Sequence, residues 1–493
     1  MRIHKSKLFR RSGFTLVEML VAAAVSIMLM VILTQAFAAG LDMFRRMRAQ
    51  GNMQERLRMA SITMRDDLTR PHFGTGGANL TSDGLSAKDI HQAYSGGWNP
   101  ETYGYFRISQ GQMSDFTGTP IMEFGAGGLP LPFALEGTDP EGLIYTRAST
   151  HFIAFTVRRN GETYNEMFRC RDFVRAVPDA PPGPYVFPRD FVFPSDYRED
   201  ISGTESYFTS RWAEVAYFLA PTNSTTGGGV PLFTLHRRAK LLVPNSGSGV
   251  PSTSFIPASA PPASPEISSR TQISAPAGQF YNRPSTVSQP RNRFGMQPAP
   301  NTVAAPPIPP GHDPRVAGLL LPGYVNRFPT LAEELGANSA DAGNDILLHD
   351  VLSFEIKAWW EEPAVSADLT AAEVTSLRPR QFYNYPGTAS IPNTDYPFDY
   401  LPYSTKNVYF SNSATYNTSL ARVFDTWSDS NGSPYETLLG GPMPEWRRVD
   451  AVAPNNTAAR LPIPIRIKAL QIRIRIWDAK TEQTRQITII QDM

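Results

Sequence analysis

The chain has 493 residues, of which 41% are hydrophobic, so it is long enough for more than one ordinary domain. Its 46 basic and 45 acidic residues give a net charge of +1, and the five basic residues among the first 13 leave −4 for the remainder. A net charge this close to zero differs from the strongly basic charge typical of nucleic-acid-binding proteins. Cys170 is the only cysteine, so no intramolecular disulfide can form, and none of the seven histidines has the spacing to a cysteine partner that structural zinc sites use.

An apolar run, residues 14–33, follows a basic segment. Residues 1–13 contain no acid, whereas the run is apolar except for Thr15, Glu18 and Ser26. At about 1.5 Å per helical residue, a run of this length spans roughly 30 Å, the thickness of a hydrocarbon core. A carboxylate in such a segment costs about 2.5–3.5 kcal/mol at the bilayer centre and less near its surface. Glu18 is therefore a candidate functional residue.

The stretch Gly13-Phe14-Thr15-Leu16-Val17-Glu18 resembles the leader junction of type IV pilins and pseudopilins. In that family a prepilin peptidase cuts after the glycine, the new N-terminal residue is usually Phe and becomes N-methylated, and the fifth mature residue is Glu. The resemblance therefore implies cleavage between Gly13 and Phe14, N-methylation of Phe14, and a role for Glu18 in assembly.

Two other interpretations of this N-terminus are an ordinary secretory signal and a plain signal anchor. Ala36-Phe37-Ala38 resembles a signal-peptidase site, but the apolar run is longer than a usual signal core and Glu18 would have no purpose in it. A signal anchor explains the hydrophobicity but not Glu18. N-terminal sequencing separates the processed forms, because pilin processing gives a start at Phe14 and signal cleavage a start at Ala39.

The helical pattern continues past the apolar run as an amphipathic segment, residues 41–71. Apolar residues recur at three- and four-residue spacing, and Pro71 is expected to end the helix. Gly40 and Gly51 are weak points, each costing about 1 kcal/mol relative to alanine, and we hypothesise that the helix loosens there on assembly. The apolar positions are Phe44, Met47, Leu57, Ala60, Met64 and Leu68.

Arginines occupy the other face of this segment, at positions 45, 46, 48, 56 and 58. Such a stripe is open to interpretation as a nucleic-acid patch, a lipid patch or a solvated helix face near the membrane surface. Charged helix faces are most often simply solvated, so the last interpretation is favoured.

Residues 72–243 carry patterns typical of antiparallel strands. Asn160-Gly161 is the strongest short hairpin signal, and we expect Cys170, on the returning strand, to be a buried structural thiol. The glycine runs at 74–77 and 125–128 lack a following Lys-Ser/Thr and are interpreted as turns. Two hairpins are predicted, 152–158 with 164–170 and 212–219 with 232–243.

Two long elaborations interrupt the pattern. Residues 244–313 are dominated by Pro, Ser and Ala and are predicted to be a disordered insertion. Residues 362–460 are rich in aromatic, Asn, Ser and Pro residues. Within them, Asp425, Asp429, Asn431 and Gly432 loosely suggest a calcium loop, but they lack the alternate acids and final Glu of an EF-hand, so no metal is predicted.

Structure is predicted to resume between and after these elaborations. A short helix is expected at 331–335, and a long strand at 346–360. The C-terminal part alternates isoleucine with arginine from 463 to 476, shifts phase near Ala469, turns at 478–481 and returns through 485–490. A phase shift within one strand predicts a β-bulge, and the arginines are expected on the solvent-facing side of the sheet.

This order predicts an α+β fold in which one long N-terminal, partly transmembrane helix packs on antiparallel β-sheet, with long Pro/Ser-rich insertions. The predicted divisions are a leader (1–13), a transmembrane and assembly helix (14–40), its amphipathic continuation (41–71), a β-rich globular part (72–243), the disordered insertion (244–313) and a second β-rich part that completes the globular domain (314–493).

Within the pilin-like family, the chain most resembles J-type minor pseudopilins. The patterns that carry this likeness are Arg65-Asp66-Asp67-Leu68, Glu214-Val215-Ala216-Tyr217, Leu235-His236-Arg237-Arg238, Val351-Leu352-Ser353-Phe354-Glu355-Ile356 and Leu461-Pro462 before Ile465-Arg466-Ile467. The ending, Trp477-Asp478 followed by Gln486-Ile487-Thr488-Ile489-Ile490, is similar to long pilin-like proteins called Verru_Chthon cassette protein C. The long insertions depart from a compact J-type subunit.

The resemblance implies a minor pilin-like subunit, assembled at or near the tip of a type II secretion pseudopilus or a type IV pilus-like fibre. Its implied partners are a prepilin peptidase, other minor and major pilin-like subunits and the inner membrane, with the N-terminus cytoplasmic and the globular part extracytoplasmic. Nucleic acid and cofactors are not expected. The alternative is a minor type IV pilin for adhesion or DNA uptake.

A signal-anchored extracytoplasmic enzyme is the rival class. The sequence has no H-E-x-x-H and no Walker A motif, and Gly247-Ser248-Gly249 lies in the predicted disordered segment rather than on a strand-to-helix turn. Asp66 and Asp67 are adjacent on a helix, so their carboxylates point in different directions and do not form a catalytic dyad. The sequence therefore predicts a protein that is not an enzyme.

Overall fold

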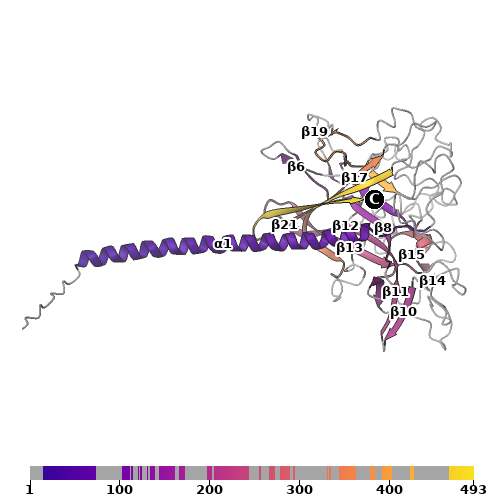
Figure 1. Ribbon diagram of the computed structural model, residues 1–493, viewed down its shortest axis with the longest axis horizontal. Coiled ribbons are helices and arrows are strands. Elements are labelled where there is room, and N and C mark those ends of the chain that lie inside the picture. The colour runs from indigo at the N-terminus through magenta and orange to yellow at the C-terminus, as the bar shows by residue number, and fades with distance from the viewer. Residues whose placement is uncertain are drawn as a thin grey trace, which may run out of the picture. The chain divides into compact units, whose positions relative to one another are not determined.

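The computed structural model places a long helix and a large antiparallel sheet in the chain (Figure 1). The chain divides into two units, Met1–Glu55 and Arg56–Met493. The residues that the structure describes are 15–73, 103–110, 113–114, 120–121, 123–124, 130–131, 134–138, 144–160, 166–171, 197–202, 205–243, 255–256, 266–272, 278–288, 292–294, 330, 332, 334, 343–361, 378–383, 391–401, 422–426 and 466–493.

Helix α1 runs without a break over Leu16–Leu68, 53 residues. It passes through Gly40 and Gly51, around which a β-carbon would meet nothing within 4 Å. The two glycines therefore interrupt nothing in this state, and loosening on assembly remains a hypothesis. The helix ends three residues before Pro71, as the proline predicts.

The main sheet has eight antiparallel strands in the order β20-β1-β8-β12-β13-β17-β21-β22. With the helix, it gives the predicted α+β fold. The strands are β1 (Phe106–Gln110), β8 (Phe152–Arg158), β12 (Trp212–Thr225), β13 (Pro231–Leu241), β17 (Ile346–Glu361), β20 (Arg422–Asp425), β21 (Arg466–Asp478) and β22 (Gln483–Asp492).

Most of the predicted pairings are confirmed. Strands β12 and β13 form the second hairpin, and β21 pairs with β22 through a turn after Asp478. The predicted bulge is also present, because Trp359 pairs with Ala469 whereas the next residue, Trp360, pairs with Ile467. Lys468 is the extra residue, which accounts for the shift of phase in the sequence.

The first predicted hairpin is wrong. Strand β8 pairs with β1 on one edge and β12 on the other, so neither edge is open to residues 164–170. Instead, β9 (Phe168–Arg171) joins β11 (Glu205–Ser210) and β10 (Tyr197–Ser202) in a separate three-stranded sheet. Cys170 on β9 is buried, as expected, opposite Phe208. Long-range pairing overrides the local turn signal here.

The prediction that 244–313 is disordered is wrong for the part that the structure describes. Strands β14 (Phe255–Ile256), β15 (Ser269–Gln272) and β16 (Gly278–Tyr281) form a small sheet, followed by the short helix α3 (Pro284–Val287). The reason is a buried carboxylate on β12. Glu214 accepts hydrogen bonds from the Ser268 hydroxyl (2.7 Å) and the Phe294 amide (2.6 Å), and from Tyr105 (2.7 Å). Composition alone does not reveal such partners.

The remaining small pairs are β2 (Met113–Ser114) with β3 (Pro120–Ile121), β4 (Glu123–Phe124) with β5 (Pro130–Leu131), β6 (Ala134–Thr138) with β7 (Ile144–Arg147), and β18 (Phe382–Tyr383) with β19 (Ile391–Pro392). Residues 332 and 334 are helical, in agreement with the short helix predicted at 331–335. The domain boundaries inferred from the sequence remain predictions.

The C-terminal part of α1 is held on the sheet by apolar contacts and one buried ion pair. Leu57, Ala60, Met64 and Leu68 are buried along one face of the helix. Asp67, 1% exposed, accepts two hydrogen bonds from the Arg237 guanidinium, at 2.7 and 2.9 Å, and one from the Tyr217 hydroxyl at 2.5 Å. A bidentate pair of this kind fixes both position and orientation. It joins the end of the helix to β12 and β13.

The chain leaves the helix through a buried histidine. His72 Nδ1 lies 2.8 Å from the Thr156 carbonyl oxygen, and Nε2 lies 3.3 Å from that of Leu68. Gly104, at φ +87°, lies so close to the His72 carbonyl that a β-carbon there would clash with it. Burial lowers the pKa of the His72 imidazole to about 4, although both carbonyls favour the protonated form.

We predict that Asp67→Asn lowers the free energy of unfolding by about 3–5 kcal/mol, because it leaves the Arg237 guanidinium largely buried without its counter-charge. The matched control is the adjacent Asp66→Asn, which breaks a half-exposed pair with Arg70 and is expected to cost at most about 1 kcal/mol. Urea denaturation of the detergent-solubilised protein measures both. Equal effects of the two substitutions would contradict this account of the anchor.

We also predict that His72 makes stability depend on pH. Its pKa is about 4 in the folded protein and near 6.5 when unfolded, so the unfolded chain binds a proton that the folded one does not. Stability should fall as pH drops from about 7 to about 4, by about 3 kcal/mol from this residue. His72→Gln should flatten this part of the profile, whereas His349→Gln, at an exposed position, should not. An unchanged slope in His72→Gln would refute the assignment.

Candidate functional site

The predicted processing site lies at the edge of the described chain. Gly13 and Phe14 are outside the described residues, so their predicted cleavage and methylation are not tested by the geometry. Thr15 and Glu18 are described, at the start of α1. The described part of the site therefore begins at the first helical turn.

Glu18 closes a capping box with Thr15. The Glu18 Oε2 atom accepts hydrogen bonds from the Thr15 amide at 2.9 Å and from the Thr15 hydroxyl at 3.0 Å. In return, the Glu18 amide donates to the Thr15 hydroxyl at 3.3 Å. Reciprocal contacts of this type satisfy amides that have no partner within the helix. The carboxylate also lies at the positive end of the helix dipole, which favours its charge.

The role of Thr15 was not predicted from the sequence. The signal was present, since Ser/Thr followed three residues later by Glu/Gln before an apolar run is the capping-box pattern. Among the described residues, no donor contacts Glu18 Oε1, so one oxygen of the carboxylate is still able to accept a hydrogen bond.

The helix beyond this box exposes a continuous apolar surface. Leu16, Met30 and Leu33 have exposed fractions of 80%, 72% and 69%, and the side chains between them are also exposed. By length and composition, α1 is the one helix among the described residues that could cross a membrane. An apolar surface of this size is not stable in water, so it requires lipid or other apolar helices around it.

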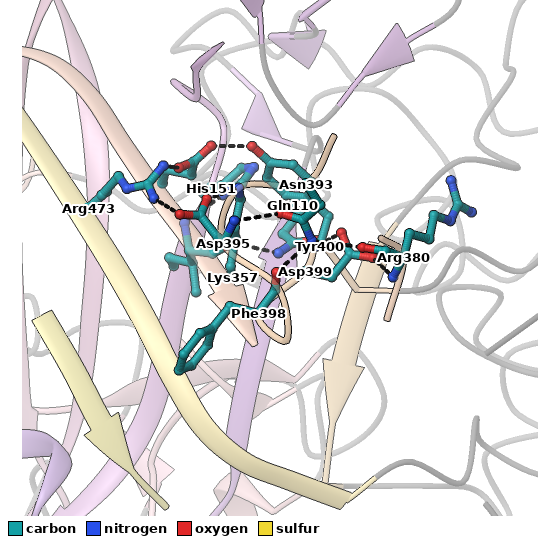
Figure 2. Close-up of polar contacts among 12 residues, drawn as sticks. Gln110, His151, Lys357, Arg380, Asn393, Asp395, Phe398, Asp399, Tyr400 and Arg473 are labelled. Atoms are coloured by element: carbon teal, nitrogen blue, oxygen red, sulfur yellow. Dashed lines mark hydrogen bonds and ion pairs between the residues drawn. The ribbon is translucent and has the colours of Figure 1, made fainter. Parts of the chain in front are cut away.

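A second cluster of charges lies on the large sheet, where segment 391–401 crosses β17 and β21 (Figure 2). Asp395 receives the Lys357 ammonium at 2.5 Å and also pairs with the Arg473 guanidinium. Arg473 contacts Glu355 as well, at 3.2 Å, and Glu355 accepts a hydrogen bond from the Tyr400 hydroxyl. Two carboxylates and two cations thus hold the segment on the sheet.

Backbone contacts complete this attachment. Asp399 and Ala358 exchange two backbone hydrogen bonds of 2.9 Å each, and the Gln110 side chain accepts one from the Leu401 amide at 2.9 Å. Burial alone would raise the pKa of the Glu355 carboxyl, but Lys357 and Arg473 lower it below its ordinary value. The same two cations lower the pKa of Asp395. The cluster therefore attaches the segment to the sheet through its ion pairs.

The other candidate chemistry is not assembled in the part of the chain that the structure describes. No group of three or more His, Cys, Asp or Glu residues there could hold a metal ion. Asp425 lies on β20 opposite Arg107, whereas Asp429, Asn431 and Gly432, the other members of the loose calcium pattern, lie outside the described residues. Asp67 is bound to Arg237 and Asp66 to Arg70, so the two do not act together.

Comparison with known proteins bears on the N-terminus. A family model, the prokaryotic N-terminal methylation motif, matches residues 8–34, which include the leader junction, Glu18 and the apolar run. No curated protein and no solved structure matches the chain. The match supports a type IV pilin-like family and indicates a structural subunit that is processed by prepilin peptidase. The apolar helix fits membrane anchoring.

We predict that Asp395→Asn releases segment 391–401 from the sheet, because it removes the charge that Lys357 and Arg473 share. A hydrogen bond to a charged group contributes about 1.5–3 kcal/mol, so opening should become roughly ten- to hundred-fold more frequent. Trypsin cleavage after Arg380 measures this opening, and Thr394→Ala, an exposed neighbour, is the control. Cleavage no faster than in the wild type would contradict the role of the cluster.

Proposed function

We propose that this protein is made as a membrane precursor, cleaved between Gly13 and Phe14, N-methylated on Phe14, and assembled into a pilus-like fibre. One observation supports this most strongly. A carboxylate, Glu18, lies within the matched methylation motif, in the first turn of a helix whose apolar side chains are exposed for more than a membrane thickness.

The proposed topology follows from the resemblance to prepilins, in which the basic leader lies in the cytoplasm. Here the leader carries five basic residues and no acid. The leader is then cytoplasmic, α1 crosses the inner membrane, and the β-rich part lies on the extracytoplasmic side. A prepilin peptidase acting at the cytoplasmic face would meet the Gly13–Phe14 bond directly.

Glu18 is the proposed assembly contact. Its Oε2 atom binds Thr15 of the same helix, which leaves Oε1 to accept a donor from outside. The methylated amine of Phe14 in a neighbouring subunit supplies a positive charge. Pairing the two leaves no unpaired charge among the apolar helices of the fibre and fixes the register between adjacent helices.

We further propose that the subunit is a minor one, a pseudopilin of the J type or a member of the Verru_Chthon cassette protein C family, at or near the fibre tip. Support comes from the elaborations beside the main sheet, namely the sheet of β9 to β11, the sheet of β14 to β16 and the segments 378–383 and 391–401. A repeating shaft has little room for additions of this size, whereas a tip position does not confine them.

We predict that Glu18→Ala and Glu18→Gln leave cleavage intact but reduce incorporation into the fibre at least ten-fold. Both remove the charge that pairs with the neighbouring amine, and Gln keeps the shape of the side chain. N-terminal sequencing reports cleavage by a start at Phe14. Co-purification with the other pilin-like subunits, from cells that also contain a prepilin peptidase, reports incorporation.

Thr15→Ala is the matched control for this pair. It removes the partner of Glu18 in the capping box at a cost of about 1 kcal/mol, but it keeps the carboxylate charge. It should therefore be incorporated at close to the wild-type level. Normal incorporation of Glu18→Gln would count against the assembly contact, and a mature start other than Phe14 would count against pilin processing.

A further inference from the structure

A belt of three arginines follows the apolar part of α1. We call Arg45, Arg46 and Arg48 the arginine belt, and all three side chains are exposed. Arg45 makes a loose pair with Asp42 at 3.5 Å, with the two side chains 76% and 65% exposed. Within the described residues, Arg46 and Arg48 have no acidic partner. The belt lies wholly within the unit Met1–Glu55.

The other two arginines of the predicted stripe belong to a different environment. The Arg56 guanidinium donates a hydrogen bond to the His349 carbonyl at 3.1 Å, within the unit Arg56–Met493. Arg58 is exposed in that same unit. Arg56 therefore contacts the globular part of the chain, and the belt needs an explanation of its own.

The belt occupies one broad face of the helix. At about 100° per residue, Arg48, Arg45 and Arg46 together cover roughly 160° of the circumference. Exposed apolar side chains, Met43 and Met47, lie on the opposite side. A helical segment with a basic face and an apolar face is typical of the membrane interface, where charged groups meet the headgroups and apolar groups meet the acyl chains.

The position of the belt along the axis fits the headgroup region of a bilayer. Arg45 is 29 residues after Leu16, which corresponds to about 44 Å in a continuous α-helix. A bilayer with both headgroup regions is roughly 40–45 Å thick. If the first turn of α1 lies at one membrane surface, the belt lies in the headgroups of the other, and its long side chains can reach the phosphates.

We propose that the arginine belt binds the phosphate groups of anionic phospholipids in the leaflet that faces the β-rich part. This rests on the proposed function, because it requires α1 to cross the membrane. Guanidinium groups form paired hydrogen bonds with phosphate oxygens and suit this ligand better than a diffuse charge would. The belt fixes how deeply the unassembled subunit lies in the bilayer and opposes its removal from anionic membranes.

The test compares the full-length mature protein in lipid nanodiscs of phosphatidylcholine alone and of phosphatidylcholine with phosphatidylglycerol. Phenylglyoxal modifies exposed arginines, and mass spectrometry reads the rate at each one. Modification of Arg45, Arg46 and Arg48 should be about five-fold slower in the anionic discs, and high salt should remove the difference. Arg485, exposed on β22, should react at the same rate in both discs. Inorganic phosphate added to neutral discs should give no protection.

A triple variant, R45Q/R46Q/R48Q, provides an independent measurement. The wild type should need more detergent for extraction from anionic vesicles than from neutral ones, and the triple variant should lose this difference. R58Q, at an exposed position of the same helix, should keep it.

The outcomes separate the belt from the proposed function. Modification rates of the three arginines that are high and equal in both discs would show that they are solvated, which would overturn the proposed binding to lipid phosphates. Rates that are low and equal would show that protein covers the arginines, and would also overturn it. Failure to enter either disc would show that α1 does not span the bilayer, which defeats the proposed function and the belt together.

Discussion

The globular part depends on the buried contact between Asp67 and Arg237. Neither charge is tolerated in the protein interior without the other, because an unpaired buried ion costs several kcal/mol. The pair therefore fixes the end of α1 against β12 and β13, which are the fourth and fifth strands of the sheet order. The other six strands pair outward from β12 and β13, with β8, β1 and β20 on one side and β17, β21 and β22 on the other. The path of the chain after the helix depends on the same pair, because the pair positions the end of α1. His72 then hydrogen-bonds to the carbonyl of Leu68, the residue after Asp67.

The same principle organises the segments that lie outside the main sheet. Arg238 and Lys240 on β13 pair with Glu334, Lys357 on β17 and Arg473 on β21 pair with Asp395, and Glu214 on β12 binds the segment around Ser268. Each of these side chains alternates with apolar residues along its strand. These charged side chains are thus covered by segments that supply either the opposite charge or, for Glu214, hydrogen-bond donors, and these contacts order the segments.

This arrangement explains which features could be predicted from the sequence. Alternation correctly located β8, β12, β13, β17, β21 and β22, and the phase shift located the bulge at Lys468, because both signals arise within one strand. The partner of β8 could not be predicted, since Asn160-Gly161 favours a local turn while the pairing is decided by distant strands. Arg473 was expected to face solvent, and its half-buried pairs with Asp395 and Glu355 depend on a loop that carries no periodic pattern.

At the N-terminal site, too, the charge could be predicted from the sequence but its contacts could not. The charge of Glu18 within an apolar run is visible in the sequence and indicates function, but Thr15 was assigned no role until the contacts between the two were known. Those contacts alter the energetics of the helix. A carboxylate that caps its own helix satisfies free amides and sits against the positive end of the dipole, so the isolated subunit lowers the cost of carrying it in lipid. In the proposed fibre, a positive amine from a neighbour would add to an interaction that already exists. Assembly would then not have to rescue an unstable subunit; it would have only to offer Glu18 a better second partner than lipid can.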